Sequence, residues 1–131
     1  MAIAALITWL ITAVGGFVML AGWIGRGGHR PGSSGRLSPT MIFTHLLLAA
    51  VGLIVWIIYV AADTDALAWV AFILLLPVAL LGFTMFARWL GSRRTSGAPE
   101  SRFPMPVVLG HGLFAAVTLV LVLLTAVGVG E

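Results

Sequence analysis

Two histidines of this sequence lie inside apolar stretches that are long enough to cross a membrane. They are His45 and His111, whereas the third histidine, His29, lies in a segment rich in Gly, Ser and Arg. Ionisable side chains within a bilayer usually face the interior of a helix bundle and serve a function. His45 follows Thr40 by five residues and His111 follows Met105 by six. Both imidazoles should therefore lie at one depth, roughly 7 to 9 Å along their helices.

Four apolar stretches must position these histidines. The 131 residues are 61% hydrophobic and 8% charged, with a mean hydropathy of +1.16, which is too apolar for a soluble domain. A spanning helix needs roughly 20 apolar residues, and barrel strands would alternate instead. We predict an all-α fold, an integral membrane four-helix bundle that forms a single domain over residues 1–131. The predicted spans are Ile3–Ile24, Thr40–Ala62, Ala66–Leu90 and Met105–Val127.

The basic residues predict how the spans are oriented. All seven arginines lie in or beside the first and third connections, while the second connection carries Asp63 and Asp65. The positive-inside rule places the first and third connections in the cytoplasm and both termini outside, in a multi-pass protein of the cell membrane. The N-terminal run has no basic segment before it and is expected to remain as the first span. Because the arginines flank spans, we expect contact with the lipid bilayer and no nucleic acid partner.

Local signals give the ends of the helices. Ser38 followed by Pro39 is typical of an N-cap and first helical turn, and Pro104 marks the start of the last span. Only residues 63–65 separate the second and third spans, so these should form a tight hairpin. The first connection, residues 26–36, has no apolar periodicity and is expected to be flexible. The tryptophans and the tyrosine near the span ends are expected to form interfacial belts.

An internal repeat relates the two halves of the chain. Residues 1–65 align with residues 67–131 without a gap, at an offset of 66 residues. Residues 16–25 pair with 82–91, residues 45–53 pair with 111–119, and the matches include Trp, Met, His and Phe. Duplication of a two-helix hairpin predicts a pseudo-two-fold axis along the membrane normal. His45 and His111 would then face each other from diagonal helices of the bundle.

Small residues follow each histidine on the same helix face and predict a slot for a flat ligand. Two neutral imidazoles on opposite sides of such a slot can be the axial ligands of one b-type haem. Two arginines, each nine residues before its histidine, could pair with haem propionates or with lipid headgroups. The expected cofactor-binding residues are His45, His111, Ala49, Ala115, Gly52, Thr118, Gly110, Gly112, Arg36 and Arg102, with His45 and His111 on the haem iron.

With four spans and this histidine placement, the chain resembles four-helix membrane-bound b-type cytochromes, in which histidines of a bundle hold haem between spans. The resemblance covers the architecture and the histidines. It implies an electron-transfer protein or subunit that exchanges electrons with a quinone or a redox partner protein. Independently of the resemblance, the short connections leave little room for a soluble catalytic domain, so a homo-oligomer or a larger complex is expected. The chain departs from larger two-haem cytochromes in having one intramembrane histidine pair, so the resemblance does not imply a relay across the full membrane.

Two other functions stay open. Met19 and Met85 are repeat mates, and two thioethers with two imidazoles would suit Cu(I), as in a copper-binding membrane protein. Alternatively, the histidines could only link helices in a non-catalytic structural subunit.

Cysteine is absent, which removes thiolate metal sites and covalent haem attachment. No Asp or Glu lies within a span, so we expect no hydrolytic catalytic residues.

Overall fold

The computed structural model describes residues 1–94 and 97–130, over which the chain is helical and contains no strand. Each of the four long helices is long and apolar enough to cross a membrane. The predicted all-α fold with four spans is confirmed, and every helix ends within two residues of its predicted bounds. The elements are α1 (Ala2–Gly25), α2 (Pro39–Ala62), α3 (Asp65–Ser92), the short 3₁₀ helix η1 (Pro99–Arg102) and α4 (Met105–Ala126).

The helix ends form as their local sequences predict. The Ser38 side chain accepts a hydrogen bond from the backbone N–H of Met41 at 3.2 Å, and Pro39 occupies the first turn of α2. At the other end of α2, Asp63 adopts the left-handed conformation with φ 50° and ψ 46°. This conformation turns the chain so sharply that α3 begins at Asp65. The predicted cap and the predicted tight hairpin are both confirmed.

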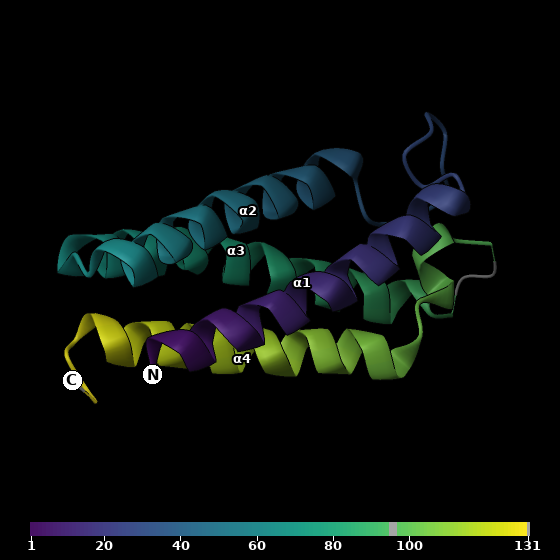
Figure 1. Cartoon of the computed structure of the whole chain (residues 1–131). Coiled ribbons are helices and arrows are strands. Elements are labelled where there is room, and N and C mark those ends of the chain that lie inside the picture. Colours follow the sequence, from purple (N-terminus) through teal and green to yellow (C-terminus); the bar gives the residue numbers. More distant parts are fainter. Residues whose placement is uncertain (95–96, 131) are drawn as a thin grey trace.

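The four helices pack as two pairs (Figure 1). α1 packs mainly on α4 and α2 mainly on α3, the pairs meet chiefly along α3 and α4, and among the described residues α2 and α4 make no backbone contact. The 66-residue repeat relates α1 to α3 and α2 to α4. The α1–α4 pair therefore corresponds to the α3–α2 pair. The termini and the α2–α3 turn lie at one end of the bundle, and the other two connections lie at the opposite end.

Most of the tryptophans near the span ends, which were expected to form interfacial belts, are buried by the protein itself. Trp23, Trp56 and Trp89 are at most 3% exposed, and only Trp69 is strongly exposed, at 42%. The Trp56 indole N–H donates to the carbonyl oxygen of Ala2 at 3.2 Å, which ties α2 to the start of α1. Bulky apolar side chains cover the outer surface, as expected where lipid is the solvent. Examples, one per helix, are Val14, Leu47, Leu80 and Leu113.

The first and third connections pack on each other instead of extending freely. Leu37 of the first connection is 6% exposed and Ala98 of the third is 2% exposed. The two connections also exchange hydrogen bonds, including one from the Ser34 hydroxyl to the carbonyl oxygen of Gly97 at 3.4 Å. The end of the first connection, residues 34–37, therefore makes long-range contacts that local composition does not reveal.

Candidate functional site

The structure brings His45 and His111 together across the bundle. Their ring centroids are 6.3 Å apart, and the ring planes are inclined at 55°. Each histidine follows the first residue of its helix, Pro39 or Met105, by six residues. Both side chains are half-buried. Two imidazoles from diagonal helices thus meet at equivalent positions along those helices.

Each imidazole is anchored to a neighbouring helix through Nδ1. His45 Nδ1 lies 3.0 Å from the carbonyl oxygen of Val78 in α3, and His111 Nδ1 lies 2.8 Å from that of Thr12 in α1. Because a carbonyl oxygen only accepts hydrogen bonds, both rings must donate an Nδ1 proton. The remaining nitrogen, Nε2, has no hydrogen-bond partner within the described part of the chain. Metal-binding histidines are commonly held in this way, with one nitrogen on a carbonyl and the other free for the metal.

Two glycines make room for the anchored rings. A Cβ atom at Gly16 would lie 3.2 Å from His111 Cε1, and a Cβ atom at Gly82 would lie 3.4 Å from His45 Cε1. Gly16 follows Thr12 by four residues and Gly82 follows Val78 by four, so each notch lies one turn from the carbonyl that binds the ring. Neither glycine was among the predicted cofactor-binding residues. The available signal was that the repeat pairs them, just as it pairs the histidines.

The expected slot is not open along its full length. A Cβ atom at Gly52 would lie 3.1 Å from the Trp9 ring, so the indole already fills the space beside this glycine. Thr118 is 2% exposed, and its hydroxyl can donate to the Thr8 hydroxyl at 2.8 Å or to the carbonyl oxygen of Phe114 at 2.7 Å. Gly52 and Thr118 therefore serve helix packing, and any open space must lie closer to the histidines.

The remaining small residues lie nearer to the histidine level. Ala49 is half-buried and packs against the apolar core, and Ala115 is also half-buried. Gly110 and Gly112 flank His111, and a Cβ atom at either would meet nothing within 4 Å. Gly112 is exposed and Gly110 is half-buried, so the open space at Gly112 lies on the outer surface of α4 and not between the histidines.

Among the described residues, the predicted arginines and methionines make no hydrogen bond with the histidines. Arg36 and Arg102 are exposed, and the Arg36 guanidinium lies against Gly91 at the end of α3. Met19 and Met85 are half-buried. Among the described residues no group of three or more His, Cys, Asp or Glu side chains could hold a metal ion. The candidate metal ligands that the structure brings together are the two imidazole rings.

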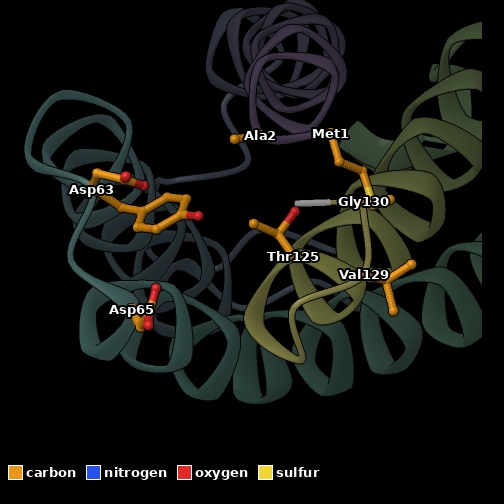
Figure 2. Close-up of a pocket in the computed structure, with 8 residues that line it drawn as sticks. Met1, Ala2, Asp63, Asp65, Thr125, Val129 and Gly130 are labelled. Atoms are coloured by element: carbon orange, nitrogen blue, oxygen red, sulfur yellow. The ribbon is translucent and has the colours of Figure 1, made fainter.

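A polar cavity of about 330 Å³ lies at the opposite end of the bundle (Figure 2). Its lining includes Tyr59 and the hairpin residues Asp63 and Asp65, and Figure 2 shows Thr125 across the opening from the two carboxylates. The repeat pairs Tyr59 with Thr125, so both halves contribute equivalent positions to the wall. None of the predicted cofactor-binding residues lines this cavity.

No protein-family model matches the chain, and neither the curated proteins nor the solved structures contain a match. The functional assignment therefore depends on the geometry of the histidine pair.

Proposed function

We propose that this chain is a membrane electron-transfer protein or subunit of the b-type cytochrome kind, which binds one haem between His45 and His111. The observation that supports the proposal is the anchored imidazole pair, with 6.3 Å between ring centroids. Metal–imidazole bonds are about 2 Å long, so two rings bound on opposite sides of one metal have centroids about 6 Å apart. The spacing of the pair fits that arrangement.

The donor set also favours a macrocycle over a bare ion. The site offers two nitrogens and lacks further acidic, Cys or His ligands within the described residues. A haem brings four nitrogens of its own and supplies reversible one-electron chemistry when bound. The residues of the chain orient the site: the carbonyl oxygens of Val78 and Thr12 hold the Nδ1 protons, fix the ring orientation and make Nε2 a stronger donor.

The position of the pair indicates where electrons would enter and leave. His45 and His111 lie near the arginine-bearing end of the bundle, which the positive-inside rule assigns to the cytoplasm. A quinone or a redox partner protein would then exchange electrons at the cytoplasmic side of the cell membrane. Arg36 and Arg102 are exposed at that end and could meet propionates or lipid headgroups.

A structural role is the second candidate, because the same hydrogen bonds already connect helices. His45 links α2 to α3, and His111 links α4 to α1. Polar side chains often connect transmembrane helices in this way without binding a cofactor. In that case the chain would be a non-catalytic subunit of a larger complex.

The decisive experiment is purification in detergent from haem-replete cells, followed by absorption spectroscopy and metal analysis. We expect a Soret band, a redox-sensitive α-band and one haem per chain. His45→Ala and His111→Ala should each weaken haem retention at least about tenfold, since even changes outside the direct ligands cost this much. His29→Ala is the matched control and should retain haem.

Each alternative has its own result. A colourless, metal-free protein would refute the haem proposal and leave the interhelical links as the function of the histidines. Copper in the metal analysis, reduced by Met19→Leu or Met85→Leu, would support the copper alternative instead. Equal haem loss in all three histidine variants would contradict the proposed ligands.

A further inference from the structure

A fully buried carboxyl group lies among the arginines at the histidine end of the bundle. Glu100, in η1, is 0% exposed. Its Oε1 atom accepts hydrogen bonds from the backbone N–H groups of Arg36 and Leu37 and from the Ser92 hydroxyl, the last at 2.8 Å. Its Oε2 atom is buried without a hydrogen-bond partner, and the carboxyl forms no ion pair within the described residues. Burying such a group is costly, so the bonds that it makes must offset a substantial penalty.

These hydrogen bonds join three helix ends. Arg36 and Leu37 directly precede Ser38, the N-cap of α2, and Ser92 is the last residue of α3. Glu100 itself lies five residues before Met105, the first residue of α4. One side chain thus connects the segments that lead into the two histidine-bearing helices.

The surroundings of the carboxyl are fitted to it. A side chain at Gly35 would collide with Oε2, so this position admits only glycine without rearrangement. Arg88 donates to the carbonyl oxygen of Arg36 at 3.2 Å, and Arg26 donates to the carbonyl oxygen of Pro99 at 2.6 Å. Both guanidinium groups therefore bind peptide groups adjacent to the carboxyl or its partners. They bring positive charge close to the buried group.

The repeat does not account for this carboxyl. The residue paired with Glu100 at the 66-residue offset is Ser34, whose hydroxyl makes the 3.4 Å bond to Gly97. The first half of the chain thus has no carboxyl group equivalent to that of Glu100, which accepts three hydrogen bonds. It supplies a contact between the halves that a symmetric pair of hairpins would lack.

We infer that Glu100 is a positioning residue for the histidine site, and that its carboxyl sets the depth of His45 relative to His111. Because each histidine lies six residues into its helix, fixing the starts of α2 and α4 fixes the heights of both imidazoles. The consequence for a cofactor rests on the proposed haem function. The alignment of the two helices is a property of the protein alone and can be measured without haem.

The chain contains no cysteine, so paired spin labels can be placed cleanly. Thr40→Cys and Val120→Cys put labels on exposed positions in the first turn of α2 and about four turns into α4, so that the line between the labels runs mainly along the helix axes. In haem-free protein, Glu100→Ala should shift or broaden the label–label distance by about 1.5 Å or more, the rise of one helical residue. Gly35→Ala should act in the same direction, because its Cβ displaces the carboxyl. Glu100→Gln should preserve the distance, since its amide oxygen can replace Oε1.

Asp65→Asn is the matched control, since it neutralises an exposed acid at the opposite end and should leave the distance unchanged. An unchanged distance in both Glu100→Ala and Gly35→Ala would overturn the inference, even if these variants were less stable to heat. If Glu100→Ala does not fold, Ser92→Ala and Gly35→Ala provide the same test in a chain that keeps Glu100.

The haem-loaded protein supplies a second measurement. In Glu100→Ala, part of the haem should show the spectrum of a site with one imidazole, whereas Glu100→Gln should resemble the parent protein. If the parent protein binds no haem but Glu100→Ala still shifts the distance, the proposed function is refuted and the positioning role stands. If haem binds and neither measurement changes in Glu100→Ala, the positioning role is refuted and the proposed function stands.

Discussion

Each imidazole of the histidine pair has one ring nitrogen engaged and the other free of hydrogen bonds within the described residues. The engaged nitrogen depends on a backbone carbonyl, and no substitution can remove a carbonyl directly. The hydrogen bonds can instead be tested by substituting Gly16 and Gly82, because these glycines let the rings approach the carbonyl oxygens of Thr12 and Val78. Because neither glycine has a side chain, each ring can keep its Nδ1 hydrogen bond, which fixes its tautomer and orientation. Both properties govern how well Nε2 can bind a metal.

Gly16→Ala is predicted to disturb His111 more than Gly82→Ala disturbs His45. The added Cβ would lie 3.2 Å from the ring in the first case and 3.4 Å in the second. Loss of the Nδ1 hydrogen bond should cost about 0.5 to 1.5 kcal/mol of stability and weaken haem retention. Thermal unfolding in detergent and the haem-to-protein ratio measure the two effects.

Gly112→Ala is the control for this prediction, because a Cβ there would meet nothing within 4 Å. It should leave stability unchanged or raise it slightly, since Ala is the better helix former. Equal effects of Gly16→Ala and Gly112→Ala would show that the notch beside His111 is unimportant.

The two halves also differ at single residues near the site. The Thr8 and Thr118 hydroxyls join α1 to α4 at 2.8 Å, about two turns from His111 along α4. Their repeat mates are Leu74 and Gly52, which cannot form such a bond. The environments of the two histidines are thus equivalent in backbone geometry and unequal in polarity, with the more polar side at His111.

At the scale of the helices, Trp9 and Gly52 bring α1 and α2 together. The indole of Trp9 is 4% exposed and lies where a side chain of residue 52 would project. We predict that Gly52→Ala destabilises the bundle by about 1 to 3 kcal/mol, because the added methyl group overpacks a closed contact. Thermal unfolding in detergent measures the change.

A second substitution tests the cause of that loss. Trp9→Phe should restore part of the stability in the Gly52→Ala background, because the smaller ring leaves room for the methyl group. Val51→Ala, at an exposed neighbouring position, should have little effect. If Trp9→Phe and Gly52→Ala simply added their losses, the contact between them would not be the reason for the destabilisation.

The helices were predictable because their signals are local. The length and apolar composition of each span and the Ser38–Pro39 cap can be recognised within short segments, and the helices of the structure agree with these predictions. The packing of the connections was not predictable from composition. Glu100 is buried because two segments distant in sequence meet over the helix ends. A relevant signal was present, since Glu100 is the only acidic residue near seven arginines.

The histidine pair was predictable because the repeat and the counting of residues from the helix starts depend on the sequence alone. The carbonyl partners were not, because every residue carries a carbonyl and its availability depends on how neighbouring helices pack. The slot was overestimated at Gly52, where a distant indole fills the space. Small residues near a candidate ligand indicate either room for a cofactor or close packing, and only the neighbouring helix decides which.

At the scale of the whole molecule, charge is separated along the bundle. All seven arginines lie at or near the end that carries the first and third connections, and the acid near them, Glu100, is fully buried. Asp63 and Asp65 are exposed at the other end. Moving one elementary charge across a membrane potential of 100 mV costs about 2.3 kcal/mol, so such an asymmetry strongly favours one insertion direction.

We predict that the arginine end faces the cytoplasm, and the absence of cysteine makes this directly measurable. Ser34→Cys and Thr64→Cys place single thiols at exposed positions of opposite ends. A membrane-impermeant maleimide added to intact cells should label Thr64→Cys, and it should label Ser34→Cys only after the membrane is permeabilised. The parent chain, without a thiol, should stay unlabelled in both conditions. The reverse pattern would place the histidine pair near the outer surface and would move the expected exchange with a quinone or redox partner to that side.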